Sequence, residues 1–261
     1  MTGSASLADG YRLRWLAAAG GAALLVSLVM LVPARVAIGW LGLPPGMASG
    51  VTGTAWHGEI RHLALGSGRL ILGPVRWQLK PSSLLLARLA AEVRAELPDG
   101  FVAADISLSA GGKLTLRNLE AAAPLTWLAP GVADPGSQLS ARFDRLVLAK
   151  GWIATAVGSL QLAGVILPIP AGNARLDPGS YTLGFDAHDV LAGQPVEGQL
   201  KDAGGPLELS GTVKFSPPRS YELQGRAKAR PNAPPEVGNA LTMLGPALPD
   251  GTHQVSLAGS F

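Results

Sequence analysis

The side chains of this sequence that could carry out chemistry are few, and none forms a recognised catalytic arrangement. The segment His57-Gly58-Glu59 lacks the second histidine, one helical turn away, that a metalloprotease site requires. We expect exposed polar positions for all four histidines, which are His57, His62, His188 and His253.

Other reactive groups also lack the neighbours they would need. Gly111-Gly112-Lys113 has neither the upstream glycine nor the following Ser or Thr of a phosphate-binding loop, so it predicts a hairpin turn. The chain has no cysteine, which excludes disulfides, thiolate metal ligands and a cysteine nucleophile. Carboxylates occur singly along polar stretches, where solvation or pairing with a basic residue on the next strand explains them. We therefore expect a non-enzymatic protein with no catalytic, cofactor-binding or metal-binding residues.

Charge does not point to nucleic acid. The net charge of +3 is small for 261 residues, and the basic residues are scattered. A nucleic-acid-binding chain concentrates Lys and Arg on one face or along one helix. We expect no nucleic-acid partner.

Residues 15–34 form an uncharged apolar run close to the N-terminus. About 20 residues of helix, at 1.5 Å each, match the hydrocarbon thickness of a bilayer. Arg12 and Arg14 precede the run and Arg35 follows it, so the positive-inside bias favours a cytoplasmic segment 1–14 and an exported body. The alternative is a cleaved signal peptide, whose apolar region is shorter, about 7–15 residues. Residues 35–50 predict a Pro/Gly-rich linker between this helix and the body.

The remaining residues, 51–261, alternate between apolar and polar side chains. Val75, Trp77 and Leu79 alternate with Arg76 and Gln78, and similar patterns recur at 92–97, 105–109, 113–117, 181–185, 207–209 and 221–229. A sheet with one polar, solvent-facing side and one apolar side is typical of antiparallel strands. Turn signals such as 98–100, 111–112 and 202–205 separate the runs.

These patterns predict a mainly β protein: one N-terminal transmembrane helix, then a twisted antiparallel, sandwich-like periplasmic body. Short helices are expected at 82–90, 121–128 and 235–244. The stretches 53–128 and 136–244 resemble each other weakly. If this is an internal repeat, the body consists of two halves with a boundary, or seam, at 130–136. The other interpretation is that any β-meander resembles itself.

Several segments resemble the type II secretion system protein N family. They are the "GT-W-G" element at Gly53, Thr54, Trp56 and Gly58, the "W-L-P" strand at Trp77, Leu79 and Pro81, and the step at 84–89, where Ala87 replaces a common glycine. In the C-terminal half, residues 204–211 with Gly211, then Tyr221, and the closing segment 250–259 are also similar to the family.

The resemblance implies a single-pass inner-membrane component of the machine that exports folded proteins from the periplasm of Gram-negative bacteria. Its partners would be other type II secretion components and the inner membrane. The family brings no catalytic residues. We expect structural roles for the motif residues, with Gly53 and Gly58 bracketing a short strand and Trp56 and Trp77 packing on the first hairpin.

A second hypothesis comes from the residues themselves. Alternating Leu, Val and Ala with few aromatic residues would also suit an open β-groove that binds or carries lipid. The two hypotheses differ in whether the apolar face of the sheet is covered by a second layer.

Overall fold

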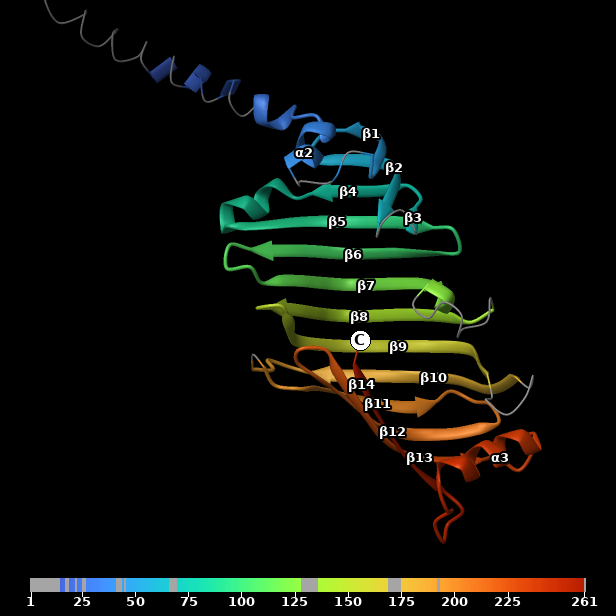
Figure 1. The fold of residues 1–261 in the computed structure, drawn as a ribbon. Helices are drawn as coiled ribbons and strands as arrows, with labels where there is room; N and C mark the ends of the chain where they lie inside the picture. The colour runs from blue at the N-terminus through green and yellow to red at the C-terminus, as the bar shows by residue number, and fades with distance from the viewer. Residues whose placement is uncertain are drawn as a thin grey trace, which may run out of the picture. The chain divides into compact units, whose positions relative to one another are not determined.

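The computed structural model describes residues 15–16, 19–21, 23–24, 27–40, 44, 46–65, 70–127, 136–168, 175–191 and 193–260. Its contacts divide the chain into two compact units, Met1–Leu79 and Lys80–Phe261, here called unit 1 and unit 2 (Figure 1). The seam expected at 130–136 falls almost entirely outside the described residues.

Unit 1 contains the N-terminal helical residues and a small antiparallel sheet. The helical positions include residues 27–30, and α2 (Ala34–Trp40) follows. The strands are β1 (Ala48–Gly53), β2 (His57–Leu65), β3 (Leu70–Leu72) and β4 (Val75–Leu79). β2 is the central strand and pairs with β1, β3 and β4.

The predicted membrane-spanning run at 15–34 is described only in part, because residues 17–18, 22 and 25–26 lie outside the described set. Within the described residues, no helix has both the length and the apolar character needed to cross a bilayer.

Unit 2 is a meander of antiparallel strands that follows the 3-10 helix η1 (Pro81–Leu86). Its described strands are β5 (Arg88–Leu97), β6 (Gly100–Ser109), β7 (Leu114–Pro124), β8 (Gln138–Ala149), β9 (Trp152–Pro168), β10 (Arg175–Ala187), β11 (Val196–Asp202), β12 (Leu207–Ser216), β13 (Ser220–Ala229) and β14 (His253–Ser260). Each strand pairs with its neighbour in sequence, which confirms the predicted antiparallel sheet.

Register keeps the alternation in phase from strand to strand. Residues directly opposite in an antiparallel pair point to the same face. One row of such partners crosses unit 2 from β5 to β14: Ala95, Val102, Ala121, Ala141, Leu160, Leu183, Leu200, Gly211, Gly225 and Val255. We call the side of the sheet that carries this row the apolar face.

The neighbouring row of partners points the other way. It runs Arg94, Ala103, Glu120, Arg142, Ser159, Gly184, Gln199, Thr212, Gln224 and Ser256. This side is the polar face. In the strands of unit 2 where the sequence shows alternation, such as β5, β6 and β13, the pattern therefore predicts correctly which residues share a side.

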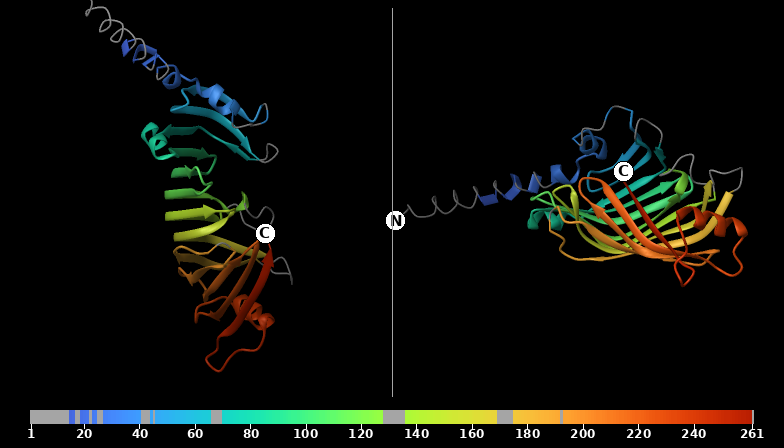
Figure 2. Two further views of the ribbon diagram at one scale, coloured as in Figure 1. Left: turned by 90° about the vertical axis from the view of Figure 1, so that its left-hand side faces the viewer. Right: turned by 60° about the horizontal axis from the view of Figure 1, so that its bottom comes forward.

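Among the described residues, one short α-helix lies against the apolar face. α3 (Pro235–Leu244) buries Val237 and Leu241, at 1% and 4% exposure, on Leu207, Leu209 and Ala227 of β12 and β13. Figure 2 shows the strands of unit 2 as one curved layer with α3 near its C-terminal strands. The sandwich-like second layer expected from the sequence is not found in the described residues. In unit 2 each described strand pairs with the one before it in a meander, so the described strands form no facing sheet.

Two of the three expected helices are replaced wholly or partly by other structure. The segment 121–128 continues β7 to Pro124 and then forms the 3-10 helix η2 (Leu125–Trp127), because Ala121 pairs with Val102 and Ala141 on both neighbouring strands. The segment 82–90 is a 3-10 turn followed by β5. The helix expected at 235–244 is confirmed as α3.

Aromatic rings packed over glycines form a cluster at the centre of the apolar face. Gly158 lies directly between Phe143 and Phe185 on neighbouring strands, and Gly198 is the next partner of Phe185. The ring centroids of Phe143 and Phe185 are 5.8 Å apart, and those of Phe185 and Phe215 are 6.0 Å apart. A methyl group on Gly198 would come within 2.9 Å of Phe185 Cε1, so the absence of a side chain makes room for the ring.

The first prediction concerns this cluster. We expect Phe185→Ala to lower the free energy of unfolding by about 3 kcal/mol, because the ring is only 8% exposed and its removal leaves a cavity. Phe101→Ala is the control, because Phe101 is 45% exposed and should cost below about 1 kcal/mol. Urea unfolding of the full chain in detergent, followed by circular dichroism, measures both. Equal losses in the two variants would contradict the assignment of the core.

Candidate functional site

The "GT-W-G" motif forms the turn between β1 and β2 in unit 1. The backbone N–H of Thr54 donates to the carbonyl of His57 at 2.8 Å, and the N–H of His57 donates to the Thr54 hydroxyl at 3.3 Å. Gly53 precedes this turn with a φ of +90°, and a side chain there would approach the His57 carbonyl oxygen to 2.5 Å. Glycine is therefore required by both the backbone angle and the space.

Two indole N–H groups connect the turn to its surroundings. Trp77 Nε1 donates to the carbonyl of Ala55 at 3.0 Å, and Trp56 Nε1 donates to the carbonyl of Val29 at 3.0 Å. The N–H of Ala55 also donates to Val32 at 2.8 Å. The turn thus joins the last residues of the N-terminal helical segment to the sheet of unit 1. We call this arrangement the junction.

Trp77 packs over Gly58 in the same way that phenylalanines pack over glycines in unit 2. The two residues are direct partners on β4 and β2. A methyl group built on Gly58 would overlap Trp77 Cζ2 and Cη2 of the indole ring. The bare glycine therefore allows the ring to reach Ala55.

The structure brings five of the eight predicted motif residues together at the junction: Gly53, Thr54, Trp56, Gly58 and Trp77. Gly53 and Gly58 are opposite partners that flank a turn, whereas the sequence placed a strand between them. Both tryptophans are half-buried.

The other three motif residues lie in unit 2. Pro81 begins η1. Gly211 faces Gly225, and a methyl group on Gly259 would come within 2.7 Å of the Tyr221 hydroxyl. They support turns and close strand approach at separate places.

The second candidate site is the apolar face of unit 2. Away from α3, most of its side chains are half-buried rather than buried, and Leu89, Leu108 and Leu257 are exposed. Near the end of β11, Asp202 forms an ion pair with Arg230. A large aliphatic surface with this exposure is typical of a binding surface.

One expected exposed histidine is buried, which corrects the prediction from the sequence. His253 is 8% exposed, and its Nδ1 lies 2.9 Å from the carbonyl of Gly245 after α3. It lies on the same face of the sheet as Val255, so the connection that follows α3 covers it. His57, His62 and His188 are exposed as predicted.

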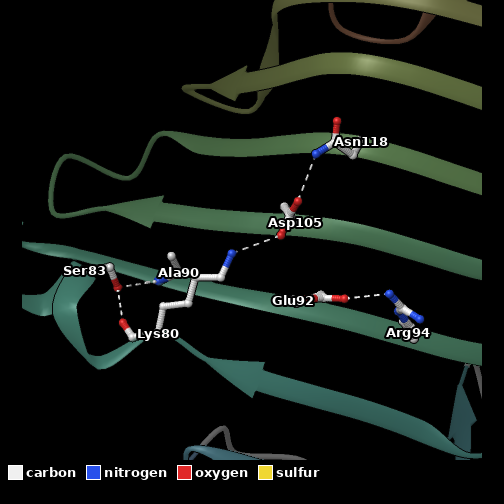
Figure 3. Close-up of polar contacts among 7 residues, drawn as sticks. All are labelled: Lys80, Ser83, Ala90, Glu92, Arg94, Asp105 and Asn118. Atoms are coloured by element: carbon white, nitrogen blue, oxygen red, sulfur yellow. Dashed lines mark hydrogen bonds and ion pairs between the residues drawn. The ribbon is translucent and has the colours of Figure 1, made fainter.

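The polar face is held by hydrogen bonds and ion pairs between strands. Asp105 accepts from Asn118 Nδ2 at 3.0 Å and from Lys80 Nζ at 3.4 Å (Figure 3). The hydrogen bond from Asn118, and then Lys80, hold the pKa of Asp105 below its ordinary value. Similar pairs join neighbouring strands at Glu120 with Arg142 and at Glu197 with Lys214.

Sequence reasoning missed the contributions of Asn118, Gly158 and Gly198. Asn118 has a φ of +49° at an irregularity of β7, which turns its amide toward Asp105. The position of Asn118 in a polar alternating run was the available signal for a polar contact. Its partner, Asp105, lies on the neighbouring strand and depends on the strand register. The role of Gly158 and Gly198 in making room for aromatic rings is recognisable only when their partners on adjacent strands are known.

The fold and the junction define a class of protein: an N-terminal helical segment tied to a small antiparallel sheet, and after it in the chain an antiparallel meander with one apolar and one polar face. The family model for type II secretion system (T2SS), protein N, matches residues 47–256, so the chain belongs to this family. Type II secretion system protein N of Aeromonas hydrophila is 28% identical over 242 residues, which cover 88% of this chain and 90% of that protein.

A second relative, type II secretion system protein N of Vibrio cholerae serotype O1, is 27% identical over 237 residues, covering 87% of this chain and 90% of that protein. No solved structure matches. The family resemblance seen in the sequence is thus confirmed.

The second prediction tests the packing of Trp77 on Gly58. We expect Gly58→Ala to destabilise unit 1 by about 2 kcal/mol, because the ring must move off its partner strand. In a Trp77→Leu background the same change should cost less than about 1 kcal/mol, since the smaller side chain leaves room. Unfolding of the wild type, the two single variants and the double variant is followed by tryptophan fluorescence and circular dichroism, which completes a double-mutant cycle. A cost that does not depend on residue 77 would contradict the packing.

The third prediction concerns acid. Because the pKa of folded Asp105 is lowered, its ionised form stabilises the fold above about pH 4, and that contribution is lost as the pH falls through the folded pKa. Asn118→Gly keeps the left-handed backbone and removes the hydrogen bond. We expect this variant to be less stable than the wild type at pH 7, with the difference shrinking at pH 3. A difference of equal size at both pH values would exclude Asp105 as its source.

Proposed function

We propose that this protein is an accessory component of the type II secretion system, held in the inner membrane by its N-terminal helix, with its sheet in the periplasm. It contributes to export of folded proteins by binding other components of the system, without catalysing a reaction. Membership of the protein N family is the observation that carries this proposal.

The N-terminal sequence supports membrane attachment. The run at 15–34 has no charge, and the basic residues are biased toward its N-terminal side. Its described leucines are exposed, among them Leu16, Leu24 and Leu28, so they have no packing partner that accounts for their apolar character within the described residues. The bond from Trp56 to Val29 would couple any displacement of this segment to unit 1.

The apolar face of unit 2 is the surface we assign to binding. Several charged groups of the polar face already pair within the chain, as Glu120 does with Arg142 and Glu197 with Lys214. By contrast, the apolar side chains of β5 to β11 have no covering layer in the described residues. Burial of this face on a partner would be favourable at about 25 cal/mol for each Å² removed from water.

A lipid is the second candidate for that surface. The exposed side chains of the apolar face are aliphatic, including Leu89 and Leu108, and a single layer leaves them accessible to an acyl chain. Membrane attachment would place the face close to a source of lipid.

The fourth prediction separates the two candidates. A photo-crosslinking amino acid is placed at Leu108, which lies on the apolar face, and at its chain neighbour Ser107, which points to the polar face. After irradiation in cells with an active type II system, the full chain is purified and its adducts are identified by mass spectrometry. We expect adducts with another secretion component at Leu108 and none at Ser107.

Each outcome decides between the candidates. Lipid adducts at Leu108, with lipid retained by the native protein, would show that the apolar face binds lipid and would contradict a protein partner at this face. Absence of both kinds of adduct at Leu108, in a strain whose secretion depends on this protein, would contradict the assignment of the apolar face.

A further inference from the structure

Successive connections of the meander in unit 2 lie at alternate ends of the sheet. One end, here called the basic end, is made by residues 81–87, 110–113, 150–151, 188–191 with 193–195, and 217–219. The opposite end is made by residues 98–99, 125–127, 136–137, 203–206 and 230–252 in the described chain. Several connections of the basic end are visible at the left of Figure 1.

The two ends differ in the sign of their charge. The described connections of the basic end carry Lys113, Lys150 and Arg219 against Asp189. Those of the opposite end carry Asp99, Glu236 and Asp250 against Arg230. The described turns at the two ends of unit 2 therefore carry opposite net charge, in a chain whose net charge is only +3.

The basic side chains at this end are exposed, and among the described residues none of Lys113, Lys150 and Arg219 has a carboxylate partner. Some basic residues of the polar face are paired, as Arg94 and Arg142 are with glutamates, so what sets the basic end apart is that its unpaired basic groups gather in the turns at one end of the sheet. Unpaired basic groups in turns remain available to an external anion.

The basic end also carries exposed leucines. Leu86 and Leu191 are 72% and 67% exposed, the highest values for any described leucine in unit 2. Leu86 is the last residue of η1, and Leu191 lies in the connection from β10 to β11. Exposed apolar side chains beside basic ones are the combination that binds the interface of an anionic bilayer.

We infer that the basic end of unit 2 docks on an anionic phospholipid surface, with Leu86 and Leu191 entering the interface and Lys113, Lys150 and Arg219 contacting lipid phosphates. Complementary charge selects an anionic surface, and the leucines favour a bilayer over an acidic protein. This contact goes beyond attachment through the N-terminal helix, and it does not depend on what binds the apolar face.

The chain has no cysteine, so a fluorescent label can be placed at a single site. The environment-sensitive dye NBD is attached to Ala110→Cys at the basic end, or to Ala203→Cys at the opposite end; both positions are exposed. The full chain is reconstituted in vesicles of phosphatidylcholine, with or without phosphatidylglycerol. We expect blue-shifted emission and protection from an aqueous quencher at residue 110 only, and only with phosphatidylglycerol.

A charge-reversed variant tests whether the basic residues of this end bind the anionic vesicle surface. It combines Lys113→Glu, Lys150→Asp and Arg219→Glu, with aspartate at 150 because it tolerates the φ of +53° there. Each charge should change the docking equilibrium by about fivefold or more, so the label at 110 should return to its spectrum in phosphatidylcholine. The control combines Arg145→Glu, Lys201→Glu and Arg226→Glu, which changes the net charge equally through exposed residues of the polar face.

Docking at the basic end predicts loss in the first variant and retention in the control, with unchanged circular dichroism in both. Leu86→Ser combined with Leu191→Ser should also reduce the spectral shift. No shift at residue 110 with phosphatidylglycerol would overturn the proposal. Equal loss in the two charge variants would overturn it as well, because it would show attraction by net charge alone.

Discussion

The structure of unit 2 depends on one constraint: the alternation of apolar and polar side chains stays in phase across every pair of neighbouring strands. A shift of one residue in any pair would move a whole strand's apolar side chains to the other side of the sheet. The row from Ala95 to Val255 shows that no such shift accumulates between β5 and β14. The register irregularities, such as the one at Asn118, are absorbed locally and leave the phase unchanged.

A single-layer sheet must stabilise its apolar face without a facing layer. Here the solution is local. Large rings lie over glycines on the adjacent strand, as Trp77 does over Gly58 and Phe185 over Gly198, so each ring contacts backbone as well as side chains. α3 closes one end of the face with Val237 and Leu241. Within the described residues the rest of the face has no covering layer, and this is the surface that we propose for binding.

Prediction from sequence succeeded where a signal is local. Period-two alternation located β4, β5 and β13, and the helix expected at 235–244 is α3. It failed at 121–128, where pairing on both sides outweighs the helical preference of alanine, and at His253, which the connection after α3 covers. At Ala87, where the family often has glycine, the residue adopts a φ of +51°, which explains why glycine suits that position.

The order of residues alone indicated the antiparallel strands that alternate in pattern, the two faces of those strands and the family, because each depends on side-chain type and on spacing along the chain. The motif residues at 53–58 were also recognised in the sequence, but the sequence predicted a strand between Gly53 and Gly58 where the structure has a turn. Tertiary structure decided whether the apolar face is covered, which glycines lie beneath rings, and which turns meet at one end of the sheet. These properties depend on strand order and register, and pairs such as Phe143 with Phe185 are brought together only by the strand between them.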